Sequence, residues 1–190
     1  LWQGNVTVLL AMLKQAEDRA NADHDILEGG VQAIILVEDE VRFYSSLLPQ
    51  IYTEITTQTA RLMAEGLNLS HRLLRIRARP KILLAQSYEE AWTLYERYAG
   101  NILGIISDVS FPRKGAIDPV AGLKLAAQVR AGVLPCPEVV YAPLGSAGTS
   151  AGIALGLAAA GLETRVRAVR VVSPRMAGTA QTRSLAHRTW

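Results

Sequence analysis

Three carboxylate side chains stand just after two short apolar runs of this sequence. Glu38 and Asp39 directly follow the run Ala33–Val37, and Asp108 closely follows the run Ile102–Ile106. Carboxylates held together repel one another, and such a group is tolerated when a hard cation lies among its oxygen atoms. Magnesium suits this setting because it takes oxygen ligands and keeps water molecules that a phosphate can replace. The three acids therefore predict a magnesium site, with Asp108 as a candidate nucleophile in phosphoryl transfer.

The elements around these acids predict a parallel sheet. Both apolar runs have the length of a strand and no polar alternation, which is typical of parallel strands buried on both faces. Segments with 3.6-residue apolar spacing separate the runs and predict helices. The expected strands are 33–37, 81–85, 102–106, 139–141 and 165–172. The expected helical segments are an amphipathic helix and linker over 5–30, then 44–65, 67–78, 88–98, 119–129 and 150–160, with a loop at 109–118.

Strands that alternate with helices favour right-handed crossovers in an α/β fold. We expect a three-layer, flavodoxin-like, doubly wound parallel sheet of five strands in the order 2-1-3-4-5, with extra helices between strands 1 and 2. Ligands of such sheets bind beyond the carboxyl ends of strands 1 and 3. Glu38, Asp39 and Asp108 follow those two strands, so we expect them to converge. The alternative is that each acid only caps its own loop or helix.

Composition and charge limit the classes of binding partner that we expect for this chain. No apolar run of the 190 residues reaches the roughly 18 that span a bilayer, so no membrane partner is expected. The net charge of +3 comes from a tail, 174–190, which we expect to be mobile, so nucleic-acid binding is not expected. The single cysteine, Cys136, cannot form an intrachain disulfide, which favours a reducing, cytoplasmic setting and a role as a small apolar filler.

A basic cluster precedes and enters the second expected strand. Its charges could grip phosphates or RNA. No aromatic residues are interleaved for base stacking, so the favoured interpretation is a solvated helix face that pairs with neighbouring acids. The cluster consists of His71, Arg72, Arg75, Arg77, Arg79 and Lys81.

Two segments resemble the receiver domains of response regulators: Ile35–Glu40, which carries the acid pair, and Ile106–Pro112, in which a proline stands four residues after Asp108. The resemblance implies that Glu38 and Asp39 hold magnesium and that Asp108 accepts a phosphoryl group. A closer resemblance, to receiver-like modules of bacterial proteins related to pyruvate, phosphate dikinase and phosphoenolpyruvate synthase, covers roughly residues 1–132. It rests on the segments 37–46, 62–68, 77–85 and 107–112.

This resemblance implies a signalling or regulatory module that acts on a protein partner or on a neighbouring domain of a larger polypeptide. Residues 1–30 resemble the exit helix of a preceding module, which suggests a piece of a longer protein. The expected domains are 1–30 as helix and linker, 31–173 as the receiver-like domain and 174–190 as the tail. No enzyme activity is expected beyond autophosphorylation at Asp108.

A second resemblance begins near Pro137. The segment Val139–Gly152 resembles the phosphate loop of pyridoxal-phosphate enzymes of the D-cysteine desulfhydrase and aminocyclopropane-carboxylate deaminase group. Glycines let a backbone approach closely, and free N–H groups at a helix start attract a phosphate. Pyridoxal phosphate is nevertheless not expected, because no lysine stands in a matching motif. The anion-binding candidates are Gly145, Ser146, Ala147, Gly148 and Thr149.

The same segment departs from the receiver pattern. Receivers carry Ser or Thr at the end of strand 4 and Lys at the end of strand 5, where this chain has Ala142-Pro143 and Ser173-Pro174. We therefore expect switching to be impaired. The chain resembles a chimera of two α/β families, and natural fusion, assembly artefact and design stay open as its origin. Three functions also stay open: a receiver-like module, a fragment of a pyridoxal-phosphate-dependent lyase or deaminase, and an interaction domain without chemistry.

Overall fold

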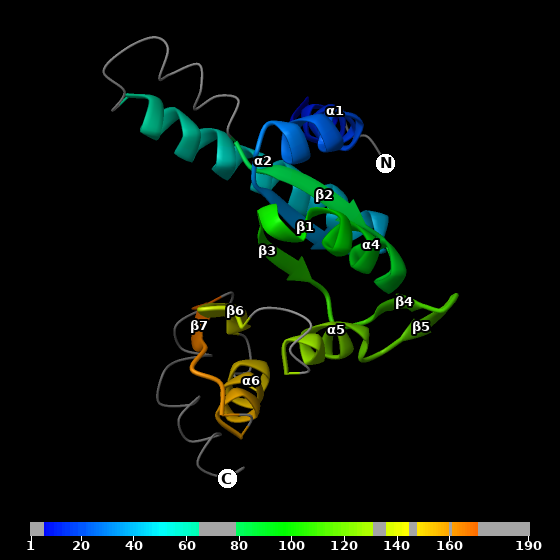
Figure 1. Ribbon diagram of the computed structural model, residues 1–190, viewed down its shortest axis with the longest axis vertical. Helices are drawn as coiled ribbons and strands as arrows, with labels where there is room; N and C mark the ends of the chain where they lie inside the picture. The colour runs from blue at the N-terminus through cyan, green and yellow to red at the C-terminus, as the bar shows by residue number, and fades with distance from the viewer. Residues whose placement is uncertain (1–5, 65–78, 131–135, 145–147, 160, 171–190) are drawn as a thin grey trace. The chain divides into compact units, whose positions relative to one another are not determined.

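The computed structural model describes residues 6–64, 79–130, 136–144, 148–159 and 161–170. The chain divides into two compact units, Leu1–Leu125 and Ala126–Trp190 (Figure 1). The expected helix at 67–78 and the expected tail at 174–190 lie outside the described residues.

A three-stranded parallel sheet forms the centre of the first unit. It consists of β1 (Ala33–Val37), β2 (Lys81–Ala85) and β3 (Ile102–Ser107) in the order β2-β1-β3. Ile35 pairs with Leu83 on one side and with Ile105 on the other. The unbroken apolar runs predicted β1 and β3 as strands buried on both faces. This burial holds for β1, whereas β3 leaves Leu103 (55%) and Ile106 (44%) exposed. A mixed α/β fold with a parallel sheet is therefore confirmed.

Two helices cover one face of this sheet, α1 (Val6–Ala20) and α2 (Val41–Ala64). Leu36 of β1 and Ile82 of β2 point to this face, where they are fully covered. Side chains of successive strand residues point to opposite faces of a sheet. Leu36 and Ile82 point to the same face, so they belong to one layer of the core. Their buried neighbours from the helices are Ala11, Leu48 and Tyr52.

The opposite face carries α4 (Tyr88–Tyr98) and the first residues of α5 (Ala121–Arg130). Ile35 and Val37 meet Ala91 there, together with Ala85, Phe111, Ala121 and Leu125. Trp92 and Tyr95 pack against this cluster with ring centroids 5.7 Å apart. Helices on both faces make the first unit a three-layer α/β/α arrangement.

A short hairpin occupies the expected loop at 109–118. It is formed by β4 (Phe111–Arg113) and β5 (Ala116–Asp118), which pair antiparallel. The turn residues Lys114 and Gly115 have φ of 55° and 79°, which are the left-handed values that two-residue hairpin turns need. The loop prediction was wrong here because three-residue strands are too short to show a period.

Side-chain hydrogen bonds join the segment after α1 to the end of α4. The segment is a π-helix, η1 (Asp23–Glu28), where the sequence indicated a linker. The Asp23 carboxylate accepts hydrogen bonds from Arg97 Nε at 2.8 Å and from the Tyr98 hydroxyl at 2.6 Å. Hydrogen bonds from Tyr98 and Arg97 lower the pKa of Asp23, and burial raises the pKa of Tyr98 to about 12.

The second unit contains one βαβ element. Its strands β6 (Val139–Leu144) and β7 (Arg165–Arg170) pair parallel to each other, and α6 (Gly148–Ala159) lies between them in sequence. In the part of the chain that the structure describes, β6 and β7 form a sheet separate from β2-β1-β3. Cys136 is exposed, with its Sγ 3.1 Å from the Thr164 hydroxyl, so its interpretation as a small apolar filler was wrong.

A buried carboxylate connects three elements of the first unit. Asp18, on the inner side of α1, is fully buried. Arg79 donates to it through two nitrogens, at 3.0 and 2.6 Å, and the Tyr52 hydroxyl donates at 2.8 Å. The backbone N–H of Ile82 donates at 3.0 Å, and Lys81 Nζ lies 3.6 Å away. Burial, and next the charge of Asp18, raises the pKa of Tyr52. One side chain thus joins α1, α2 and β2.

This network gives a first prediction. Replacing Asp18 with Ala leaves Arg79 without its buried counter-charge, and removing one partner of such a pair costs about 3–5 kcal/mol. Urea unfolding followed by circular dichroism should show a loss of that size. The matched control is Glu17→Ala, since Glu17 is 56% exposed and 3.9 Å from Arg79; its effect should stay within about 0.5 kcal/mol. Equal losses in the two variants would contradict the role given to Asp18.

Candidate functional site

Backbone hydrogen bonds hold the ends of the three central strands together. The N–H of Asp108 donates to the carbonyl of Val37 at 3.0 Å, and the N–H of Glu38 donates to the carbonyl of Ala85 at 3.0 Å. Glu38 therefore leaves β1 beside the point where Asp108 leaves β3. The structure brings these two predicted site residues to one edge of the sheet, with Asp39 next to Glu38.

The side chains at this edge differ in exposure. Glu38 is only 6% exposed, Asp39 is half-buried and Asp108 is exposed. Oε1 of Glu38 accepts the N–H of Glu40 at 3.1 Å, which turns this carboxylate toward its own loop. Burial raises the pKa of Glu38, and the charges of Asp108 and Asp39 raise it further, although the Glu40 N–H opposes the shift. The edge is thus an electrostatically unfavourable place for a carboxylate.

The carboxylate oxygens at this edge are suitable ligands for a hard cation, but they are not arranged as a complete coordination site. No group of three or more His, Cys, Asp or Glu side chains is placed to hold a metal ion within the described ranges. Glu38 already uses one oxygen within its loop. Three oxygen ligands around one ion would therefore require the carboxylates to rotate.

The loop at Asp108 is held by its own neighbours and by the start of α5. The N–H of Gly122 donates to the carbonyl of Val109 at 2.9 Å. A Cβ atom at position 122 would overlap the carbonyl oxygen of Asp108 and lie 3.0 Å from Cα of Val109. The Ser107 hydroxyl also donates to the carbonyl of Asp108 at 2.7 Å. Sequence reasoning missed Gly122, whose signal was a glycine in the first turn of an expected helix.

The predicted anion loop is described only at its end. Gly145, Ser146 and Ala147 lie outside the described residues, while Gly148 and Thr149 begin α6. Binding of a phosphate by these residues stays a prediction.

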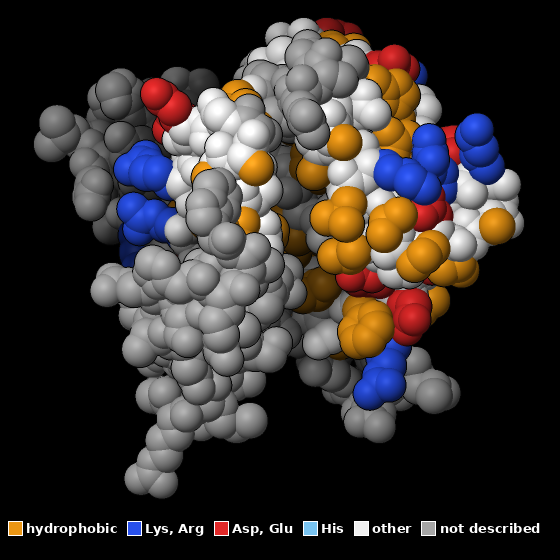
Figure 2. Space-filling model, turned by 90° about the horizontal axis from the view of Figure 1, so that it is seen from below, with side chains coloured by type: hydrophobic (Ala, Val, Ile, Leu, Met, Phe, Trp, Pro, Cys, Tyr) orange, Lys and Arg blue, Asp and Glu red, His pale blue; other side chains and the backbone are white. Residues whose placement is uncertain are grey.

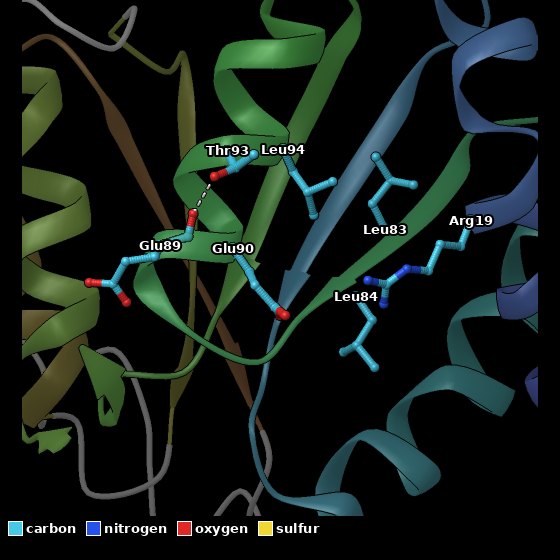
Figure 3. Close-up of a pocket in the computed structure, with 7 residues that line it drawn as sticks. All are labelled: Arg19, Leu83, Leu84, Glu89, Glu90, Thr93 and Leu94. Carbon is cyan, nitrogen blue, oxygen red and sulfur yellow. Dashed lines mark hydrogen bonds between the residues drawn. The ribbon is translucent and has the colours of Figure 1, made fainter. Parts of the chain in front are cut away.

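An apolar groove of about 290 Å³ lies along β2, the edge strand of the central sheet. Figure 3 shows Arg19 of α1 and Glu90 of α4 reaching toward β2 from opposite sides. A carboxylate oxygen of Glu90 accepts the N–H of Gln86 at 2.7 Å, just as Asp18 accepts that of Ile82. Both ends of this strand edge are therefore capped by side chains, which opposes the addition of a further strand. The remaining lining residues are Leu83, Leu84, Glu89, Thr93 and Leu94.

Comparison with protein-family models, with curated proteins and with solved structures finds no match to this chain. None of the helices that the structure describes combines the length and the apolar content of a membrane span.

The electrostatics of Glu38 give a second prediction. Replacing Glu38 with Gln removes a buried charge and keeps an oxygen that accepts the N–H of Glu40. At pH 7 the midpoint of thermal unfolding should rise by about 1–3 °C. Folding raises the pKa of Glu38. The difference in unfolding midpoint should therefore vanish as the pH falls below the ordinary pKa of a glutamate, where Glu38 is protonated in both the folded and the unfolded wild-type chain. Glu40→Gln, at an exposed neighbour, is the control and should change little.

The contact at Gly122 gives a third prediction. Gly122→Ala places a methyl group against the Asp108 carbonyl, and overpacking of this kind costs about 1–3 kcal/mol. Amide resonances of residues 107–109 should shift, and the midpoint of urea unfolding should fall. A Cβ at Gly100 meets nothing within 4 Å, so Gly100→Ala is the control. Unchanged resonances at 107–109 would show that α5 does not position Asp108.

Proposed function

We propose that this chain is a receiver-like regulatory module whose acidic edge binds magnesium and whose Asp108 accepts a phosphoryl group. The observation that supports the proposal most is the hydrogen bond from the Asp108 N–H to the Val37 carbonyl, 3.0 Å long. It keeps the acid after β3 beside the acid pair after β1. The order β2-β1-β3 agrees with the first three positions of the proposed order 2-1-3-4-5.

The charges at this edge support cation binding. Glu38 is buried near Asp39 and Asp108, and its raised pKa reflects the cost of that position. Glu38, Asp39 and Asp108 would hold the ion, which when bound would neutralise the charge of the carboxylates and of an incoming phosphate. The exposed Asp108 carboxylate is open to a phosphodonor. One of its oxygens would bond to phosphorus, giving an acyl phosphate, while the bond to the donor's leaving group breaks.

The same proposal includes the partner and the location of the module. The module acts in the cytoplasm on a protein partner or on a neighbouring domain of a larger polypeptide. Switching is impaired because Ala142 and Pro143 in β6 offer no hydroxyl to a phosphoryl group. No described contact favours the second candidate, a fragment of a pyridoxal-phosphate-dependent lyase or deaminase.

A magnesium titration tests the proposal and is the fourth prediction. Adding Mg²⁺ to the full chain should shift the amide resonances of residues 38–40 and 107–109, and beryllofluoride added with Mg²⁺ should shift them further. Asp108→Asn should weaken Mg²⁺ binding about tenfold or more and abolish the beryllofluoride response. Glu96→Gln removes an exposed carboxylate from α4 and should change neither response.

The outcome separates the functions that stay open. Absence of any response to Mg²⁺ and beryllofluoride would rule out the receiver-like function and favour an interaction domain without chemistry. Binding of Mg²⁺ without a beryllofluoride response would leave a cation site and remove Asp108 as a phosphoacceptor.

A further inference from the structure

The charge of the chain is divided unevenly between its two units. The second unit, Ala126–Trp190, has seven arginines, two glutamates, no lysine and no aspartate, which gives a net charge of +5. The first unit, Leu1–Leu125, has 13 basic and 15 acidic residues, which gives a net charge of −2. Such an asymmetry between two parts of a chain indicates that the basic part binds a polyanion.

The sheet of the second unit carries charges of one sign. Its strand β7 contains Arg165, Arg167 and Arg170, and β6 contains no charged residue. The two glutamates of the unit, Glu138 and Glu163, precede the strands. On the face of the molecule in Figure 2, hydrophobic side chains lie among charged side chains of both signs, whereas every charged residue of β6 and β7 is an arginine.

The strand register places an aromatic ring beside two of these arginines. Val139 pairs with Arg165, and Tyr141 pairs with Arg167. Paired residues on neighbouring strands point to the same face of a sheet, and so do residues two apart on one strand. Tyr141 is 68% exposed, and both arginines are exposed. We call the face that carries Tyr141, Arg165 and Arg167 the Tyr141 face.

Helix α6 lies against the opposite face of this sheet. It contacts both β6 and β7. Ala142 follows Tyr141 and therefore points the other way, and it is only 2% exposed. The Tyr141 face is thus the side of the sheet that α6 leaves open. An exposed ring next to guanidinium groups suits a ligand that is both planar and negatively charged.

We propose that the Tyr141 face binds single-stranded nucleic acid. A base stacks on the ring of Tyr141, and neighbouring phosphates bind Arg165 and Arg167. Stacking on an aromatic side chain accepts any base, because every base has a π-face, and the planar fork of arginine matches the oxygens of a phosphate. The two arginines lie two residues apart on one strand, about 6.6 Å along it, and neighbouring phosphates of an extended strand reach a similar spacing.

The aromatic ring distinguishes this ligand from other polyanions. An acidic peptide would use the arginines but not the ring, and the bases of a duplex are already stacked on one another. A single strand uses both parts of the Tyr141 face. The inference does not rest on the proposed phosphoacceptor function, because Glu38, Asp39 and Asp108 belong to the first unit.

Fluorescence anisotropy of the full chain tests the stacking and is the fifth prediction. The probes are labelled oligo-dT and oligo-U of about 12 nucleotides, and both should bind with dissociation constants below about 100 µM at physiological salt. Tyr141→Ala should weaken binding about tenfold, because it removes one stacked base. Tyr141→Phe keeps the ring and should bind within about twofold of the wild-type chain. Tighter binding of one probe would identify RNA or DNA as the preferred source of the strand.

The same assay tests the arginines. Arg165→Gln with Arg167→Gln should weaken binding about tenfold and lower the slope of log affinity against log salt by about 1.4, since each phosphate contact on a single strand contributes about 0.7. The matched control removes two charges from exposed arginines of the first unit, Arg42→Gln with Arg61→Gln. It should keep both the affinity and the slope, and circular dichroism should show that all variants are folded.

Several results would overturn the proposal. Absence of binding by the wild-type chain at about 100 µM would exclude a nucleic-acid site. An equal loss in the two arginine pairs, or no loss in Tyr141→Ala, would show that binding follows overall charge and not the Tyr141 face. A polyglutamate peptide of the same length that bound as tightly as the oligonucleotides would identify an acidic protein segment as the ligand.

Discussion

The first unit depends on the burial of one charge, the carboxylate of Asp18. A charged group without water is costly unless hydrogen bonds and a counter-charge replace its hydration. Here the replacements come from Arg79, Tyr52 and the N–H of Ile82. The guanidinium of Arg79 also lies 5.7 Å from the centre of the Tyr52 ring. Any arrangement that separated α1, α2 or β2 would leave some of these groups unsatisfied, so the network selects one mutual placement of the three elements.

That placement extends across the sheet to the candidate site. The Ile82 N–H, which would otherwise be free at the outer edge of β2, is fixed by Asp18. β2 then pairs with β1 in register up to Val37 and Ala85, and the carbonyl of Ala85 accepts the N–H of Glu38. The position of the acidic edge therefore follows from the register of the central strands. The carboxylate of Glu38 is buried like that of Asp18, but its neighbours differ. They repel the charge of Glu38, whereas the neighbours of Asp18 neutralise its charge.

Local patterns predicted the elements of the first unit well. The expected strands 33–37 and 81–85 are β1 and β2 with their observed bounds, and Tyr88–Tyr98 is a helix as expected. Ser87 accepts the N–H of Glu90 at the start of that helix, a contact that reaches only three residues along the chain. The five-stranded sheet depended instead on how distant segments pair, and the described strands form separate sheets. Convergence of Glu38 and Asp108 could be predicted because both acids directly follow parallel strands.

Long-range partners explain most of what the sequence could not predict. Arg79 was counted in a basic cluster and assigned to a solvated helix face, yet its partner Asp18 lies 61 positions earlier. Lys81 was placed in the same cluster, and it is buried and bound to Asp25 at 2.5 Å. No periodicity in either segment encodes such a pairing, because the partners are fixed only when α1 packs against β2.

The orientation of α1 is the clearest case of this limit. Its apolar period is visible in the sequence, and the usual rule would turn that stripe toward the core. Asp18 lies on the other side of the helix, and its four donors come from Tyr52, Arg79 and Ile82 in α2 and around β2. Burying the stripe instead would rotate Asp18 into water and leave Arg79 without its counter-charge. A single buried carboxylate thus determines which side of α1 faces the sheet, and it leaves apolar side chains such as Leu9 and Leu13 exposed.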